Sequence, residues 1–279
     1  MGEAATYQTD VVIAGAGLAG LVTACELLDR GRRVLLIDRD ARGNLGGLAR
    51  ESFGGVHLID TPHQRRLRIR DTPELAWRDW QSVADYDDAD HWPRVWGRFY
   101  CENSGEYIHE FLRAKGVEFL PLVNWAERGL HTPGNSVPRW HIAWGLGHDI
   151  VARVTAAIEN HSHRDRLTLL FETEVSDIEM TNGRASGVRG PGVRVQADHV
   201  VVASGGVCGG DLSTLRANWR KDWGNPPPVI LNGAHKFGDG LLHRQARAAG
   251  AAVTHLDLQW HYAAGVHHPA RRREADGLS

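Results

Sequence analysis

The residues best suited to chemistry in this sequence form a short glycine cluster near the N-terminus. The cluster reads Gly15-Ala16-Gly17-Leu18-Ala19-Gly20, follows the apolar segment 10–14, and opens a segment of helical periodicity. Asp38 stands 18 residues after Gly20. A GxGxxG pattern between a strand and a helix, with an acid at this distance, is typical of a dinucleotide-binding site. NAD and FAD share this fingerprint, so the cluster alone leaves the choice between them open.

Each position of the cluster has a physical task. Gly15 permits the tight turn out of the strand, Gly17 lets the backbone approach a pyrophosphate, and Gly20 lets the helix pack on the strand. The helix that starts here offers unpaired N–H groups and a positive dipole end to phosphates. Asp38 is expected to accept hydrogen bonds from ribose hydroxyls and to disfavour a 2′-phosphate, whereas the adjacent Arg39 points the other way.

Two buried strands and one helix must position these residues. The apolar run at 10–14 predicts the first strand, apolar residues at helical spacing from 18 to 28 predict the helix, and Val34–Ile37 predicts the second strand. This order implies a parallel pair with a right-handed crossover. Farther along, glycine-punctuated apolar segments predict a β-meander, with strands at 167–171, 174–178, 185–188, 193–195 and 199–202.

The region between 73 and 144 is predicted to be mainly helical and holds seven of the ten tryptophans. The members of three tryptophan pairs stand three or four residues apart, so each pair could share a helix face. These pairs are Trp77/Trp80, Trp92/Trp96 and Trp140/Trp144. Packing in a core or at an interface is one interpretation, and an aromatic wall beside a flat ligand is the other.

Composition narrows the class of protein. The chain has 279 residues, a net charge of −2 and 42% hydrophobic residues, which is ordinary for a globular protein and gives no indication of nucleic-acid binding. It has no apolar run of 18 residues, so no membrane span is expected. The three cysteines are dispersed and predict a reducing, cytoplasmic location. The histidine pairs lack the spacing of a zinc site, so no metal is predicted.

Three stretches resemble one family, the FAD-binding dehydrogenases of the fumarate reductase and 3-ketosteroid-Δ1-dehydrogenase superfamily. The first runs from Asp10 to Asp38. The second combines Gly46-Gly47-Leu48-Ala49-Arg50 with the later Gly54-Gly55, and the third is His199-Val200-Val201-Val202-Ala203-Ser204-Gly205-Gly206. The resemblance implies an α/β fold: a Rossmann-like FAD-binding domain over 1–265 with a parallel sheet, a β-meander, and a helical, Trp-rich insertion at about 73–147. Residues 266–279 are predicted to be a disordered tail.

The resemblance also implies roles for individual residues. The glycine cluster would line the pyrophosphate, and Asp38, followed by Arg39, would lie at the ribose. Gly46, Gly47 and Leu48 would run along the pyrophosphate or the isoalloxazine. Glu174 and Val175 would lie near adenine. The return strand would close over the dinucleotide through its last residues, which are Ala203, Ser204, Gly205 and Gly206.

The reaction implied by the resemblance is hydride transfer between flavin N5 and a C–C bond next to a carbonyl. The implied substrate is a small molecule, flat, apolar and possibly ketosteroid-like in shape. No capping domain is identifiable in the sequence, so the alternative is a truncated FAD-binding module that is inactive alone or needs a partner chain. Self-association is expected if no other chain covers the flavin face. The catalytic residues are not identified; Arg139 and His141, in a segment that reads as a loop, are weak candidates.

Overall fold

The computed structural model describes residues 4–125 and 133–261, so the predicted tail at 266–279 lies outside the described residues. The chain divides into two compact units. The sheet unit contains the described residues up to Glu51 and from Thr155 onward, and the insertion unit is Ser52–Val154. The range 73–147, predicted as a helical insertion, lies within the second unit.

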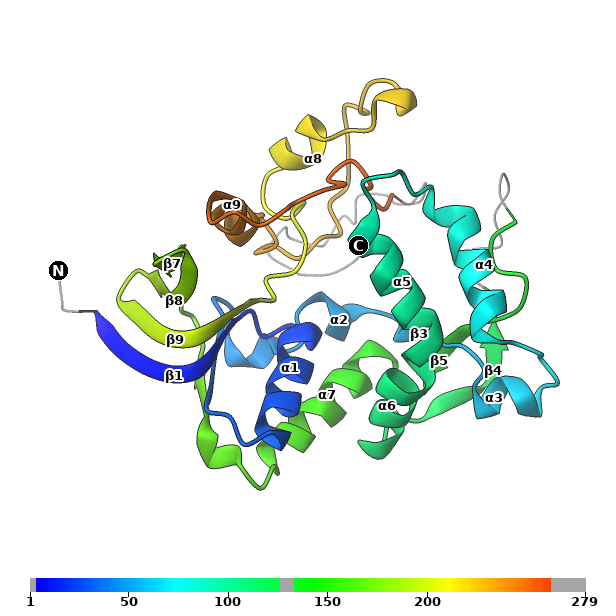
Figure 1. Ribbon diagram of the computed structural model, residues 1–279, viewed down its shortest axis with the longest axis horizontal. Coiled ribbons are helices and arrows are strands. Elements are labelled where there is room, and N and C mark those ends of the chain that lie inside the picture. The colour runs from blue at the N-terminus through cyan, green and yellow to red at the C-terminus, as the bar shows by residue number, and fades with distance from the viewer. Residues whose placement is uncertain (1–3, 126–132, 262–279) are drawn as a thin grey trace, which may run out of the picture. The chain divides into compact units, whose positions relative to one another are not determined.

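The sheet unit is built on six strands in the order β6-β2-β1-β9-β8-β7. The first four strands in this order are parallel, and the last two continue as an antiparallel meander. Figure 1 shows β1 and β9 running side by side along the sheet. The strands are β1 (Ala5–Ala14), β2 (Val34–Ile37), β6 (Leu167–Leu170), β7 (Asp177–Thr181), β8 (Arg184–Gly190) and β9 (Val193–Val202). This arrangement confirms the predicted α/β fold with a parallel sheet and a β-meander.

The sheet unit also contains short α-helices and 3-10 helices between its strands. The α-helices are α1 (Leu18–Asp29), α2 (Leu48–Glu51), α8 (Ser213–Ala217) and α9 (Leu241–Ala248), and the 3-10 helices are η1 (Arg42–Asn44), η3 (Arg164–Arg166) and η4 (Lys221–Trp223). All four residues of β2 are buried, as expected for a parallel strand covered on both faces. A core of apolar residues forms around the strands and includes Val12, Leu35, Val188, Val195 and Leu242.

Several strand boundaries differ from the prediction, three of them in ways that change the sheet. β1 begins at Ala5 rather than at 10, because Ala5–Thr9 pairs with β9, a contact distant in sequence. β9 is one continuous strand where two were predicted. The strand predicted at 174–178 begins only at Asp177, where pairing with β8 starts.

The insertion unit combines helices with a three-stranded antiparallel sheet in the order β3-β5-β4. Its strands are β3 (Gly55–His57), β4 (Phe119–Asn124) and β5 (Trp140–Ala143). Its helices are α3 (Pro62–Arg66), α4 (Pro73–Ala84), α5 (His91–Ser104), the π-helix η2 (Gly105–Glu110) and α6 (Phe111–Ala114), and the division between the units falls within α7 (Leu146–Glu159). Figure 1 shows α4 and α5 as neighbouring helices of this unit.

The tryptophan pairs have different environments. Trp77 and Trp80 on α4 pack against the core of Ile59, Ala76 and Cys101, as the core interpretation predicted. Trp92 and Trp96 on α5 share a helix face but are 65% and 63% exposed. The helical pairing of Trp140 with Trp144 was wrong: Trp140 begins β5, and Trp144 follows that strand.

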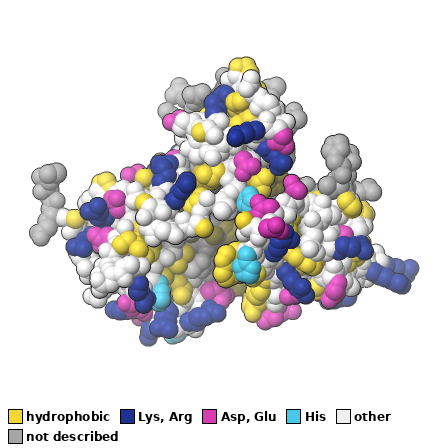
Figure 2. All heavy atoms as spheres, turned by 45° about the horizontal axis from the view of Figure 1, so that its top comes forward, with side chains coloured by type: hydrophobic (Ala, Val, Ile, Leu, Met, Phe, Trp, Pro, Cys, Tyr) yellow, Lys and Arg dark blue, Asp and Glu magenta, His cyan; other side chains and the backbone are white. Residues whose placement is uncertain are grey.

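The surface carries charges of both signs. On the face drawn in Figure 2, Lys and Arg side chains are interspersed with Asp and Glu side chains. Within residues 4–125 and 133–261, no helix is long and apolar enough to cross a membrane.

Candidate functional site

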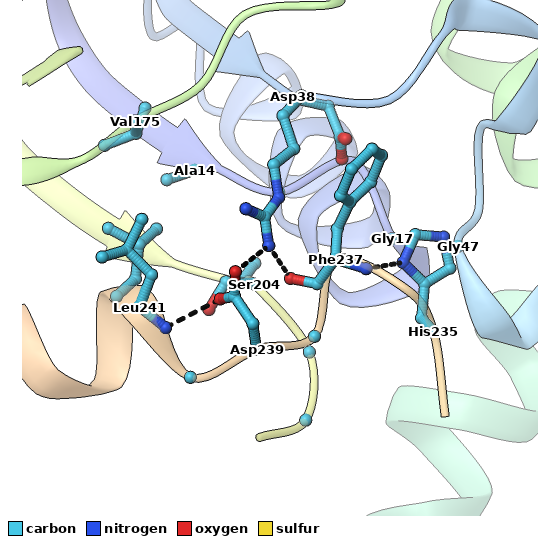
Figure 3. A pocket seen from close by; sticks show the side chains of 18 of the residues that line it. Ala14, Gly17, Asp38, Gly47, Val175, Ser204, His235, Phe237, Asp239 and Leu241 are labelled. Carbon is cyan, nitrogen blue, oxygen red and sulfur yellow. Dashed lines mark hydrogen bonds and ion pairs between the residues drawn. The ribbon is translucent and has the colours of Figure 1, made fainter. Parts of the chain in front are cut away.

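A cavity of about 190 Å³ lies in the sheet unit, at the carboxyl ends of β1, β2 and β9 (Figure 3). In open parallel sheets, ligands bind at this edge. Eleven residues proposed from the sequence line the cavity: Gly15, Gly17, Asp38, Arg39, Gly47, Leu48, Val175, Ala203, Ser204, Gly205 and Gly206. Segments that are as far apart in sequence as the glycine cluster and the return strand therefore meet at one site.

Six other proposed residues do not line the cavity. Ala16 and Gly20 are buried beneath the glycine turn, and Leu18 and Ala19 belong to the first turn of α1. The remaining two, Gly46 and Glu174, contact other predicted site residues. The N–H of Gly46 donates to the carbonyl of Ala16 at 2.9 Å, which holds the second glycine segment against the first. Glu174 contacts the cavity residue Arg39, described below.

The glycine turn has no room for a side chain at Gly15. A Cβ built there would lie 2.2 Å from the carbonyl oxygen of Ala203, and the residue has a φ of +117°. Glycine is therefore required both by close contact and by backbone conformation. The Gly15 N–H also donates to the Ile37 carbonyl at 2.8 Å, which ties the ends of β1 and β2 together beside the cavity.

Gly17 is different, because its missing side chain leaves room for a ligand rather than for protein atoms. A Cβ at Gly17 would meet nothing closer than the Gly46 carbonyl oxygen at 4.0 Å, and Gly205 and Gly206 have open space at the same position. Gly17 also caps α1 without a side-chain hydrogen bond, and the first turn of α1 carries no acid. A bare backbone cradle at a helix N-terminus fits a pyrophosphate group.

Asp38 is held rigidly at the end of β2. One carboxylate oxygen accepts from the Ala16 N–H at 2.5 Å, and the other accepts from the Asp40 N–H at 2.7 Å. These contacts fix the carboxylate between the glycine turn and the cavity, where its remaining lone pairs can accept from hydroxyl groups.

The segment 234–242 supplies most of the cavity wall that lies outside the predicted site residues. Its lining members are Ala234, His235, Phe237, Gly238, Asp239, Gly240, Leu241 and Leu242. Figure 3 shows His235, Phe237, Asp239 and Leu241 of this segment around the cavity. The motif Gly238-Asp239-Gly240 was the signal in the sequence that could have indicated this wall.

Arg39 joins this segment to the rest of the site. Its guanidinium donates to the Phe237 carbonyl, pairs with Asp239 at 2.9 Å and with Glu174 at 3.3 Å, and lies 4.6 Å from the centroid of the Phe237 ring. Burial raises the pKa of Asp239, but the Leu241 N–H and Arg39 outweigh it and lower that pKa overall. Asp239 is thus held as a carboxylate.

The candidates Arg139 and His141 lie in the insertion unit, away from solvent. The segment is not a loop at His141, which belongs to β5, and the two residues are 1% and 0% exposed. Arg139 binds both oxygens of Asp71 at 2.8 and 2.9 Å and Asp79 at 2.8 Å. His141 Nδ1 donates to the Arg139 carbonyl, so its Nε2 accepts from the Thr61 hydroxyl. The guanidinium nitrogens of Arg139 and both ring nitrogens of His141 are thus hydrogen-bonded within the protein.

No group of three or more His, Cys, Asp or Glu side chains is arranged to hold a metal ion in the part of the chain that the structure describes.

Comparison with known proteins agrees with this geometry. A family model described as an FAD binding domain matches residues 10–277. A KsdD-like steroid dehydrogenase of Mycobacterium tuberculosis is 40% identical over 95% of this chain and 50% of its own length. The chain therefore spans about half the length of this curated relative. These matches confirm the resemblance to FAD-binding dehydrogenases that the sequence motifs indicated.

Two solved structures share the fold. The 3-ketosteroid-Δ4-(5α)-dehydrogenase of Rhodococcus jostii RHA1, solved with 4-androstene-3,17-dione, gives a TM-score of 0.72 at 22% identity, covering 90% of this chain and 56% of that one. A flavocytochrome c3 fumarate reductase gives a TM-score of 0.73 at 20% identity, covering 88% of this chain and 41% of that one. At these identities the likeness shows the fold.

Proposed function

Because the chain belongs to the FAD-binding domain family, we propose that it binds FAD in the cavity of the sheet unit and serves an FAD-dependent dehydrogenase or reductase. The observation that carries this proposal is the glycine cradle, in which Gly17, Gly205 and Gly206 leave space at the cavity rather than against protein atoms.

The residues of the cavity fit the parts of FAD in the order that the sheet edge imposes. Gly17, at the N-cap of α1, would hold the pyrophosphate through its backbone N–H group, and Gly15, whose own N–H is bound to Ile37, would shape the turn beside it. Asp38 would accept from the ribose hydroxyls, and Val175 would lie against adenine. Gly47 and Leu48 would follow the pyrophosphate toward the isoalloxazine, and Ser204 with its following glycines would cover the dinucleotide.

When bound, FAD supplies hydride transfer at N5, and the chain supplies position and electrostatics. We propose a substrate with a C–C bond next to a carbonyl, flat and apolar, of the ketosteroid class. The support is the 40% identity to a KsdD-like steroid dehydrogenase. Since Arg139 and His141 are buried and satisfied, we propose no proton-transferring role for them, and the acid and base of the reaction stay unassigned.

A second candidate function has its own observation. The chain covers only half of its steroid-dehydrogenase relative, so it could serve as an FAD-binding module that needs a partner chain for turnover. An exposed apolar stripe on α5 and η2 favours association: Trp92, Val95, Trp96, Phe99 and Tyr107 are each more than 40% exposed. We expect the chain alone to self-associate, and a stable monomer in size-exclusion chromatography with light scattering would contradict this.

The deciding experiment titrates FAD into the purified chain and follows visible absorption and flavin fluorescence. The native chain should bind FAD noncovalently. Gly17→Ala should fold normally, because its Cβ has room, yet bind at least about tenfold more weakly, because the methyl group occupies the cradle. Gly43→Ala, with nothing within 4 Å of its Cβ and no place in the cavity wall, is the matched control. Equal affinity of Gly17→Ala and the native chain would sink the proposed site.

Turnover separates the two candidate functions. FAD-loaded chain would be mixed with 4-androstene-3,17-dione and an artificial electron acceptor, and acceptor reduction followed. Reduction would support the dehydrogenase, whereas tight FAD binding without any reduction across a panel of flat ketones would support the module.

A further inference from the structure

Arg39 poses a question that the proposed function does not answer. It directly follows the ribose-facing acid, in the position where a cation could select a 2′-phosphate. In this structure its guanidinium is already engaged by two carboxylates, those of Glu174 and Asp239, and by the Phe237 carbonyl. The side chain of Arg39 is 20% exposed and those of Glu174 and Asp239 are 42% and 36% exposed, so these contacts are partly shielded from solvent.

The partners of Arg39 come from distant parts of the chain. Glu174 lies 135 positions away, between β6 and β7, and Phe237 lies 198 positions away. The contact with Phe237 is double, since the guanidinium binds its carbonyl and also lies 4.6 Å from its ring centroid. Figure 3 shows the two dashed contacts that end on Phe237 and Asp239, inside the wall of the cavity. One side chain therefore holds the segment 235–239 against the end of β2.

Asp239 has a double role in the same contact. One of its oxygens pairs with Arg39, and the other accepts from the Leu241 N–H at 2.9 Å, at the first residue of α9. Asp239 thus connects Arg39 to the first residue of α9. Gly238 and Gly240 flank Asp239, and Gly240 has a φ of +74°. Because glycine has wide conformational freedom, the backbone here depends on side-chain contacts to hold its conformation.

We propose that Arg39 is a positioning residue that clamps the segment 235–239 over the adenosine end of the FAD cavity, and that it does not recognise a phosphate. The inference rests on the proposed function for the identity of the ligand, but the clamp itself is a property of the cofactor-free chain. A 2′-phosphate would have to displace two carboxylates and lie close to them, which like-charge repulsion opposes. The site is therefore selective for FAD and other dinucleotides with a free ribose.

The first test needs no cofactor. Hydrogen exchange of backbone amides is measured in the cofactor-free native chain, in Arg39→Ala and in Asp239→Asn. Amides of residues 237–242 should exchange about threefold faster or more in both variants, because local opening no longer breaks the ion pair. Arg42→Ala removes an arginine three positions away whose partner, Glu159, lies elsewhere, and it should leave these amides unchanged. Unchanged exchange in Arg39→Ala would overturn the clamp.

The second test uses three probes: FAD, ADP and 2′,5′-ADP, each titrated by calorimetry. Arg39→Ala should weaken FAD and ADP by about tenfold, the cost of losing charge-assisted contacts that shape the site. Asp239→Asn, which keeps the size and the Leu241 contact, should reproduce part of that loss. If Arg39→Ala selectively weakened 2′,5′-ADP, the residue would be a phosphate binder and the proposal would be wrong. If the native chain bound none of the probes, the proposed function would fail while the exchange experiment still decided on the clamp.

Discussion

Two arginines in this molecule have the same kind of partners and opposite surroundings. Arg139, in the insertion unit, pairs with Asp71 and Asp79 and has no exposed side-chain surface. Arg39, in the sheet unit, pairs with Glu174 and Asp239 but lines a cavity and stays 20% exposed. An arginine between two carboxylates is therefore not diagnostic of a role. The space beside each arginine is what distinguishes them. Arg139 has only protein around it, whereas Arg39 lines a cavity that a ligand can fill.

The buried polar groups around Arg139 are extensively hydrogen-bonded to one another. Asp71 also accepts from the Gln64 amide at 2.9 Å, and Asp79 accepts from both the N–H and the hydroxyl of Ser136. Burial lowers the pKa of Arg139, but its two carboxylate partners outweigh burial and raise that pKa overall. The guanidinium is thus a fixed cation that connects α4 and the segment before β5.

The largest effect should come from removing the buried cation. Arg139→Leu leaves two carboxylates without their partner in a dry interior, so the free energy of unfolding should fall by about 3–5 kcal/mol. Urea denaturation followed by tryptophan fluorescence measures this. Arg78→Ala is the control, because Arg78 is 72% exposed and lies 3.7 Å from the same Asp79. A loss below about 1 kcal/mol for Arg139→Leu would mean that the buried ion pairs of Arg139 do not stabilise the fold.

The second-largest effect should be a loss of stability of the insertion unit at acidic pH. His109, stacked on Phe119, and His141 are buried, and burial lowers the pKa of each to about 4. The unfolded chain binds protons near pH 6.5 and the folded chain only near 4, so stability is full above pH 6.5 and falls as pH drops through this window. The loss should approach about 1.4 kcal/mol per pH unit for each histidine.

The variant His109→Phe tests this sign. It removes a buried Nε2 that has no hydrogen-bond partner and keeps the ring contact with Phe119, so stability should depend less on pH between 6.5 and 4. His199→Phe is a control on the other unit. The same pH slope in His109→Phe as in the native chain would show that His109 takes up its proton equally in both states.

The smallest effect should be that of Arg39→Ala on stability. Its ion pairs are partly exposed and at the rim of a cavity, so the free energy of unfolding should change by about 1 kcal/mol or less. Urea denaturation of the cofactor-free protein checks this beside Arg139→Leu. The comparison between the two arginines fails if Arg39→Ala proves as destabilising as Arg139→Leu.

The sequence allowed prediction of the features that depend on neighbours along the chain. The turn at Gly15, the helix that begins at Leu18 and the acid at Asp38 all lie in one βαβ unit, where periodicity and glycine spacing carry the information. Eleven cavity residues followed from these motifs and from the family resemblance.

What could not be predicted depends on pairing across long stretches of chain. Trp140 was assigned to a helix because its spacing from Trp144 fits one, yet its backbone pairs with His57 on β3, 83 positions earlier. The partners of Arg39 are separated from it by 135 and 198 positions, and those of Arg139 by 60 and 68. Local periodicity carries no information about such distant contacts. The contacts of Arg39 and the buried network around Arg139 could therefore not be predicted from it.

The pairing of β1 has a consequence for how the chain acquires its structure. β2 contacts only Val11–Ala14 of β1, whereas β9 pairs along the strand from Ala5 onward. The first half of β1 is synthesised before its partner residues, Val193–Ala197, which follow almost 190 positions later. Until then one strand edge stands open to other chains, and closing so long a loop is slow. The emerging polypeptide should therefore depend on chaperones, and its yield should fall when translation outpaces them.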